Sequence, residues 1–387
     1  MKGRNISQVV LSVVFAALVV TIGVIDAVNG TLSNFGFYRS VETFSDSIID
    51  NEALKNVFLN VNGIFGTFID LKGYYNDIGI YIDDDYYIYS PAKETTTDYE
   101  VRQTLALKEY LDEKGINLIY VNEPVKYTDD SFFAETFGTI SYSNRNADKF
   151  LRRISEAGIN VIDLREDIRN EGLDIKEMFY RTDHHWTVDT GFWAAEKIVA
   201  GLNRYSGYDV DLSLYDKDRY IVRKWEKCWI GEQGTKAYNN NMIPDDFTNI
   251  APSFPTSFYF RERNEDGDFS SFYDEYFYNQ PDTLFKKFGS WHYTYSLLDA
   301  VNKNVDKGKV LLVCDSYAYV CEPYMALAVN RIDSIILREF DVDVHEYLEY
   351  DSDYDTVIVC YSQGMIGAHD DPESNNYDMF TFDKNLS

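Results

Sequence analysis

The sequence predicts an α/β fold in which helices cover both faces of a mainly parallel sheet. The chain has 387 residues, 45% of them hydrophobic, which is enough for one large domain with additions and argues against global disorder. From about residue 98, helical patterns alternate with short strands that are apolar along their whole length. Because strands that are buried on both faces lack a polar alternation, this pattern indicates a sheet between two helical layers.

The first part of the pattern extends to about residue 202. Its first helix ends at Gly115, and Thr187 is a suitable N-cap for its last helix. One face of the first helix carries Val101, Leu105, Lys108 and Leu111. The expected elements are this helix, a strand over 116–121, a helix over 144–157, a strand over 159–162, and a helix from residue 187 to about 202.

The second part of the pattern lies near the C-terminus. It predicts a strand over 310–313, a helix with Pro323 at its start, a strand over 334–337, a short helix near 345–350 and a last strand over 356–360. Ligands of such sheets bind beyond the carboxyl ends of the strands, so functional side chains are expected there. Between the two parts, residues 204–305 are rich in Tyr, Phe, Asp and Asn and are interpreted as an insertion. Such insertions can be functional lids or plain excursions.

The N-terminus has a different character from the rest of the chain. Lys2 and Arg4 precede an apolar run over 9–28 of about 20 residues, which is long enough to span a bilayer core. Positive charge before the run and acidic sequence after it place the bulk of the chain outside the cytoplasm. We therefore expect residues 1–30 to be an uncleaved signal-anchor in the cell membrane, with a cleaved signal peptide and a secreted product as the alternative. Residues 31–97 would form a stalk and a small N-terminal element with a turn at 82–85, and residues 98–387 would form the main domain.

Charge and cysteine content exclude some classes of function. The formal net charge of −28 argues against nucleic-acid binding, which needs clusters of Lys and Arg. The four cysteines match no zinc-binding spacing and are interpreted as buried thiols. Outside the cell, Cys314 could instead pair with Cys321 or Cys360.

Asp183-His184-His185-Trp186 is the most informative motif of the chain, and it contains two of only five histidines. A histidine that acts as a base needs a group that fixes its tautomer, and a nearby carboxylate does this. Asp183 and His185 are two residues apart, so an extended segment would place both on one side. His185 is therefore the predicted base. His184 would point the opposite way, as a packing or substrate-contacting residue, and Trp186 would be part of the core or a pocket wall.

Ser316 is the predicted nucleophile. It follows Asp315 at the carboxyl end of the apolar strand over 310–313, where the next backbone N–H groups, such as that of Tyr317, can line an oxyanion site. Such a serine is usually only a turn residue. Together with a His–Asp pair, however, it completes the set that activates a serine hydroxyl.

Three further residues are expected near the same edge of the sheet. Asn122 follows the strand over 116–121 and is either a second oxyanion donor or a capping residue in a turn. Arg338 and Tyr361 follow two later strands and would face the same crevice, although salt bridging or packing would also explain them. A zinc site built on the His-His-Asp set is the rival interpretation, but no cysteine or further histidine cluster completes it. The sequence thus predicts no metal and no cofactor.

Residues 180–187 resemble the signature of the DHHW family, which is related to the alginate O-acetylation proteins and, more distantly, to the SGNH hydrolases. Residues 116–127, 161–165 and 310–317 resemble other segments of that family. The resemblance implies an SGNH-like three-layer α/β/α fold with Asp183, His185 and Ser316 as a triad. Cys314 departs from the pattern, since many relatives have glycine there, and its side chain would crowd the oxyanion site.

The resemblance also implies a function. Relatives of this type modify extracellular polysaccharides and often work beside a membrane-bound O-acyltransferase that supplies the acyl group. The expected function is thus a membrane-anchored, extracytoplasmic serine O-acyltransferase that acetylates a cell-surface or secreted polysaccharide. The alternatives are an esterase with the same triad and a non-catalytic glycan-binding or assembly protein that keeps the fold.

Overall fold

The computed structural model describes residues 74–75, 79–237, 243–261, 263–272, 299–340 and 343–386. Contacts divide the chain into residues 1–65 and 66–387, and all described residues belong to the second unit. The predicted signal-anchor over 1–30 and most of the predicted stalk lie outside the described residues. Among the helices that are described, none is both long and apolar enough to cross a membrane.

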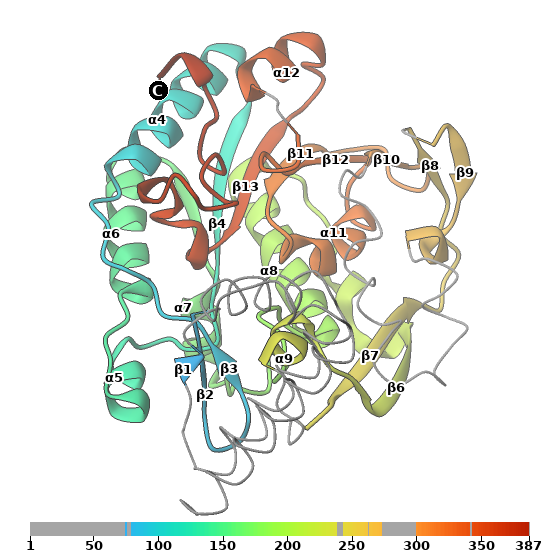
Figure 1. The fold of residues 1–387 in the computed structure, drawn as a ribbon. Coiled ribbons are helices and arrows are strands. Elements are labelled where there is room, and N and C mark those ends of the chain that lie inside the picture. The colour runs from blue at the N-terminus through green and yellow to red at the C-terminus, as the bar shows by residue number, and fades with distance from the viewer. Residues whose placement is uncertain are drawn as a thin grey trace, which may run out of the picture. The chain divides into compact units, whose positions relative to one another are not determined.

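One eight-stranded sheet forms the centre of the domain (Figure 1). The first five strands in its order run parallel to one another, as predicted, and the last three are antiparallel, so the sheet is mixed. In spatial order the strands are β5 (Asn160–Asp163), β4 (Asn117–Glu123), β13 (Thr356–Ser362), β11 (Lys309–Cys314), β12 (Arg331–Ile335), β10 (Asp299–Asn302), β8 (Phe258–Phe260) and β9 (Glu265–Gly267).

Helices cover both faces of the parallel part. Every residue of β13, and every residue but the first of β4 and β11, is buried, as expected for strands between two layers. Both α4 and α8 contact β4, and Figure 1 shows them on opposite sides of it, with α6 beside α4 and α11 against α8. The helices are α4 (Asp98–Lys114), α5 (Ser131–Phe137), α6 (Ser143–Glu156), α7 (Leu164–Glu171), α8 (Val188–Ser206), α11 (Ala318–Ala326) and α12 (Val344–Tyr350).

Two strands continue further than their apolar runs predict. β4 extends through Asn122 and Glu123, which pair with Tyr361 and Ser362 of β13. Asn122 and Tyr361 therefore lie inside strands rather than after them. β12 is displaced in the other direction: it begins at Arg331 and ends at Ile335, before the predicted end. The strand bounds differ from the predicted ones because polar residues also take part in these ladders. A strand can keep pairing through its backbone where its apolar pattern stops.

Two helical predictions were also wrong in detail. The buried face of α4 includes Glu100, Gln103, Thr104 and Leu107, whereas Leu105 is 36% exposed. Polar residues can be buried there because they have partners: Glu100 accepts from the Gly367 N–H, and Gln103 bonds to Asp383. Pro323 lies inside α11 rather than at its start, since this helix begins at Ala318, two residues after the predicted nucleophile.

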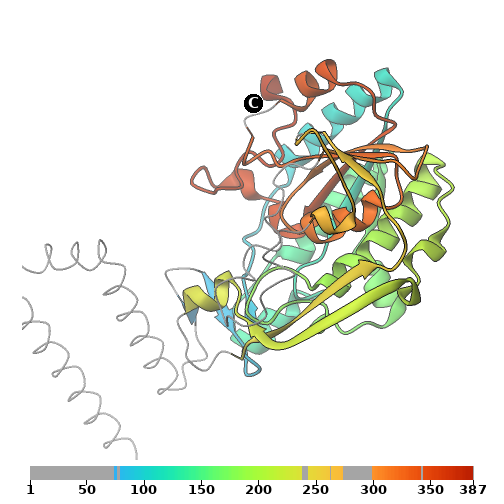
Figure 2. The ribbon, with the colours of Figure 1, turned by 90° about the vertical axis from the view of Figure 1, so that its right-hand side faces the viewer.

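The predicted insertion is part of the sheet and also contacts the loop over 172–187, which carries the predicted catalytic residues Asp183 and His185 and is named the catalytic loop below. Its described residues supply β8, β9 and β10, which extend the large sheet. They also form a two-stranded ribbon of β6 (Tyr220–Trp229) and β7 (Asp245–Pro252), seen along the lower side of the domain in Figure 2, and the short helix α9 (Glu232–Ala237). Trp229 and Phe247 from the ribbon pack against Tyr180, the first residue of the signature.

The N-terminal element is a small antiparallel sheet of β1 (Tyr74–Tyr75), β2 (Ile80–Ile82) and β3 (Ile88–Tyr89). The predicted turn is present between β2 and β3, where Asp83 Oδ1 accepts from the backbone N–H groups of Asp85 and Tyr87. The backbone N–H of Ile88 donates to the Arg181 carbonyl, so this element contacts the catalytic loop. The four cysteines are buried and free, as expected of structural thiols.

Glu322 of α11 gives a prediction about stability. It is 2% exposed, and burial raises its pKa from 4.5 to about 8. Between these two values the folded protein holds a proton that the unfolded chain releases, so the free energy of unfolding should fall as the pH rises from about 5 to about 8. Glu322→Gln should flatten this dependence, which urea unfolding at several pH values measures. Glu156→Gln, at an exposed site on α6, is the control, and equal slopes in all three proteins would contradict the prediction.

Candidate active site

The signature lies in a tight loop between α7 and α8. Phe179 and Trp186 form an isolated antiparallel bridge, and the Tyr180 N–H donates to the His185 carbonyl, so the chain turns back on itself within the motif. The loop ends at Thr187, whose hydroxyl accepts from the Thr190 N–H and caps α8 as predicted. This turn fixes the signature relative to the rigid helix that follows it.

Ser316 lies between the carboxyl end of β11 and the start of α11. The carboxylate of Asp315 is fully buried and accepts from the backbone N–H groups of Tyr317 and Ser362, each at 2.9 Å. Asp315 thereby joins the turn that carries Ser316 to the end of the neighbouring strand β13. These two hydrogen bonds fix the turn, and Ser316 is 6% exposed.

The structure brings Asp183, His185 and Ser316 together. His185 Nδ1 lies 2.6 Å from Asp183 Oδ1, and His185 Nε2 lies 2.8 Å from Ser316 Oγ. Asp183 Oδ1 also accepts from the His185 backbone N–H at 3.0 Å. With the proton on Nδ1 donated to Asp183, Nε2 is left to accept from the serine hydroxyl. This is the arrangement that activates a serine nucleophile.

His184 does not point away from this group, contrary to the alternation expected of an extended segment. Because the motif forms a turn, the His184 ring lies against that of His185 at a tilt of 37°, with 3.8 Å between centroids, and its Nδ1 lies 3.5 Å from Asp183 Oδ1. Desolvation and the neighbouring His185 lower the pKa of His184 to about 3. A neutral imidazole is therefore the form at this position near neutral pH.

Asp183, His184 and His185 also offer three possible metal-ligand atoms within 4.8 Å of one another. The ring nitrogens of His185 already contact Asp183 and Ser316, so a metal bound there would have to compete with both hydrogen bonds. The geometry thus favours the triad over the rival zinc interpretation.

Trp186 and Tyr317 connect the two loops that carry the triad. The fully buried Trp186 donates from Nε1 to the Tyr317 carbonyl at 2.9 Å, and the Tyr317 hydroxyl donates to the His184 carbonyl at 2.6 Å. Of the two predicted roles, Trp186 therefore has that of a core residue. The Tyr317 N–H is occupied by Asp315, whereas the Ser316 N–H bonds to no group of the described residues, which leaves it as the available oxyanion donor.

Of the remaining predicted residues, one lines the cavity at Ser316 and the others are buried away from it. Arg338 lies at the site: it lines the cavity at Ser316 and donates to Asn376 at 3.1 Å. Asn122 and Tyr361 are fully buried and do not line that cavity, since Asn122 donates to Asp163 and Tyr361 donates to the Met379 carbonyl. Cys314 is fully buried in the core and is likewise outside the cavity lining.

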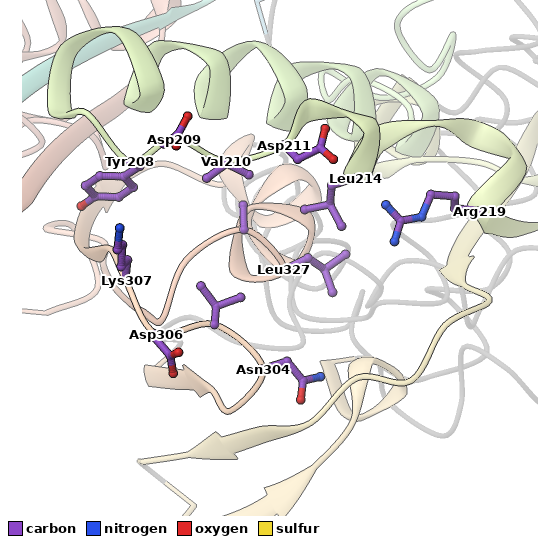
Figure 3. A pocket seen from close by; sticks show the side chains of 12 residues that line it. Tyr208, Asp209, Val210, Asp211, Leu214, Arg219, Asn304, Asp306, Lys307 and Leu327 are labelled. Carbon is purple, nitrogen blue, oxygen red and sulfur yellow. The ribbon is translucent and has the colours of Figure 1, made fainter.

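A cavity of about 560 Å³ opens at the triad. Its walls come from the loop after β3, from the loop after β4, from α9 and from the segment after β13. They include Ser90, Lys126, Tyr127, His184, Gln233, Arg338 and Asn376. Another cavity, of about 480 Å³, lies at the opposite end of the parallel strands, where Tyr208 donates to the Lys309 carbonyl at the start of β11 (Figure 3). The triad lies at the first cavity, at the carboxyl ends of the strands, as expected.

Lys126 is a cavity residue that the sequence pattern did not indicate. Its side chain is 5% exposed, and Nζ donates to the carbonyls of Ile88 and Arg181. Burial lowers the pKa of Lys126 to about 8, although the carboxylates of Asp245 and Asp183 act in the opposite direction. Lys126 thus places a cation behind the catalytic loop and links this loop to β3. A lone lysine in a loop carries no periodic or spacing signal that could have revealed it.

Comparisons with known proteins found a matching family model and similar folds. Residues 81–211, which contain Asp183 and His185, match the family model of the SGNH hydrolase-like domain of the acetyltransferase AlgX. No curated protein matches the sequence.

The fold is similar to that of Bacillus cereus PatB1 determined with a sulfonyl adduct, with a TM-score of 0.63 and 18% identity over 79% of this chain and 98% of that chain. It is also similar to a DHHW family protein from Eubacterium siraeum DSM 15702, with a TM-score of 0.54 and 16% identity over 76% of this chain and 91% of that chain. The predicted resemblance is therefore confirmed: residues 81–211 match the model of an SGNH hydrolase-like domain, and the fold is one that a DHHW family protein shares.

Proposed function

We propose that this protein is a serine O-acyltransferase that acetylates a hydroxyl group of a polysaccharide. The observation that carries the proposal is the contact of His185 Nε2 with Ser316 Oγ at 2.8 Å, while Asp183 holds the opposite ring nitrogen at 2.6 Å. The match of residues 81–211 to the SGNH hydrolase-like domain of an acetyltransferase supports the same chemistry.

The reaction would proceed in two steps through an acyl-enzyme. First, Ser316 Oγ attacks the donor carbonyl carbon while His185 Nε2 takes the hydroxyl proton and then gives it to the leaving group. Next, a sugar hydroxyl attacks the carbonyl carbon of the Ser316 ester while His185 Nε2 takes its proton; the bond from that carbon to Oγ then breaks, and His185 returns the proton to Ser316 Oγ. In both steps Asp183 stabilises the imidazolium, and the Ser316 N–H faces the developing oxyanion.

The cavity supports a hydroxyl-rich acceptor. Its walls combine amide and guanidinium groups from Gln233, Asn376 and Arg338, which can donate to or accept from sugar hydroxyls. Gln233 Oε1 is buried and makes no hydrogen bond within the described residues, so a donor from a bound ligand would satisfy it. The neutral His184 ring lies beside the same space.

The proposed setting is the outer side of the cell membrane. The apolar run over 9–28 would anchor the chain, and the acyl group would come from a membrane-bound O-acyltransferase. Esterase activity is the alternative with the same triad. It differs only in the acceptor of the second step, which would be water.

The test is acyl transfer by the full-length protein. The protein is incubated with p-nitrophenyl acetate, alone and with a panel of cello-, xylo- and chito-oligosaccharides, while nitrophenol release and the oligosaccharide masses are followed. Transfer predicts oligosaccharides heavier by one acetyl group and an acetylated Ser316 peptide. Free acetate with unchanged oligosaccharides would indicate the esterase. A release rate equal to that of protein blocked with a sulfonyl fluoride would indicate a non-catalytic protein.

A further inference from the structure

We infer that Asp245, in the insertion, is a positioning residue that holds the acid of the triad in place. The inference rests on the proposed function, because it gives Asp245 a role in the activation of Ser316. Asp245 opens β7 and lies far from the signature in sequence. It acts through Thr182, the residue directly before Asp183.

Asp245 is bonded to the catalytic loop by three hydrogen bonds. Its Oδ1 accepts from the Arg181 N–H at 2.6 Å, and its Oδ2 accepts from the N–H and the hydroxyl of Thr182 at 2.9 and 2.6 Å. The side chain is buried, with 8% exposure of the residue. Hydrogen bonds to a buried carboxylate are stronger than those between neutral groups, so the backbone at Thr182 is firmly fixed.

Thr182 is also hydrogen-bonded to residues at the start of α9. Its hydroxyl donates to Asp245 and accepts from the Gly231 N–H at 2.8 Å, while its carbonyl accepts from the Gly234 N–H at 2.7 Å. The N–H of Glu232, which follows Gly231, donates to Asp183 Oδ2 at 2.9 Å. The carboxylate of Asp183 is consequently held between His185 on one oxygen and the insertion on the other.

The segment over 231–234 approaches Thr182 and Asp183 so closely that glycine is needed at two of its positions. A Cβ atom on Gly231 would lie 2.4 Å from Asp183 Oδ2, and one on Gly234 would lie 2.7 Å from Thr182 Cβ. Neither distance is tolerated in a folded protein without movement of the loop. The two glycines therefore allow the Glu232 N–H to reach the carboxylate.

A triad acid that moves by even 1 Å no longer orients the imidazole, and such a displacement can cost about 100-fold in rate. We expect Asp245→Asn and Thr182→Val to lower kcat for p-nitrophenyl acetate by about 10- to 100-fold, with KM nearly unchanged. Thr182→Ser keeps the hydroxyl and should restore most of the rate. Asp246→Asn is the matched control, since this neighbouring, more exposed acid pairs with Lys224 instead.

A spectroscopic measurement separates this inference from the proposed function. The proton between His185 Nδ1 and Asp183 should appear in the proton NMR spectrum downfield of the amides in wild type, in Asp246→Asn and in Ser316→Ala. It should weaken or move upfield in Asp245→Asn and Thr182→Val. An unchanged signal with unchanged kcat in these two variants would overturn the role of Asp245. If wild type shows the signal but no turnover, the proposed function fails while the positioning role is still decided by the signal.

Discussion

Ser316→Ala should abolish turnover of an acetyl ester, with kcat reduced by about 10⁴-fold or more. The reason is that Ser316 Oγ is the atom that His185 Nε2 contacts, at 2.8 Å, and the alanine has no group to carry the acyl intermediate. The residual rate would come from the oxyanion donor and the cavity alone. Nitrophenol release from p-nitrophenyl acetate, measured with the full-length protein, gives kcat for each variant.

Ser155→Ala is the control for this experiment, because Ser155 is an exposed serine on α6 outside the cavity lining. It should keep the wild-type rate. Equal thermal unfolding midpoints for the two variants would show that the loss does not come from unfolding. If Ser316→Ala kept more than about a tenth of the wild-type kcat, the acyl-enzyme mechanism would be wrong.

Asp183→Asn should have the second-largest effect, a loss of about 10³- to 10⁴-fold in kcat. The substitution preserves the size of the side chain, yet an amide nitrogen facing His185 Nδ1 donates where the carboxylate accepted. The proton of His185 then moves to Nε2, which can no longer accept from Ser316 Oγ. Both oxygens of Asp183 also accept from backbone N–H groups, Oδ1 from His185 at 3.0 Å and Oδ2 from Glu232 at 2.9 Å, so in either orientation the amide nitrogen faces an N–H donor and one of these hydrogen bonds is lost.

The measurement is again kcat for the acetyl ester, together with the downfield proton signal of the His–Asp pair, which should disappear. Asp189→Asn is the matched control, since Asp189 lies in the first turn of α8 and, among the described residues, its carboxylate forms an exposed contact with Lys217. A rate for Asp183→Asn within about tenfold of wild type would mean that another group orients His185.

The sequence predicted the parts of this fold that depend on local pattern. The alternation of helices and apolar strands anticipates the five parallel strands, and the predicted helix stop at Gly115 is where the chain turns. It also anticipated that Asp183, His185 and Ser316 converge, because an acid–base pair before a helix and a serine after a strand share one edge of such a sheet.

The remaining features depend on contacts between distant segments. Glu100 and Gln103 are polar, so no hydrophobic pattern marks them as buried, yet the C-terminal segment satisfies their hydrogen bonds. Asn122 lies within its strand because β13 continues to pair with β4 beyond the apolar run. Asp245 is one of many acidic residues in the insertion and differs from Asp246 only in what it contacts. Such roles are defined by tertiary partners and leave no periodic trace in the chain.

The position of β13 has a consequence for the order in which the protein is made. This strand is the last of the sheet in sequence order and lies between β4 and β11, so the early and late halves of the parallel sheet have no direct pairing until β13 has been synthesised. Sheets built from such distant pairings form late and slowly. The parallel sheet therefore becomes continuous only once β13 has been made, and a chain that stops before residue 356 would leave the facing edges of β4 and β11 unpaired.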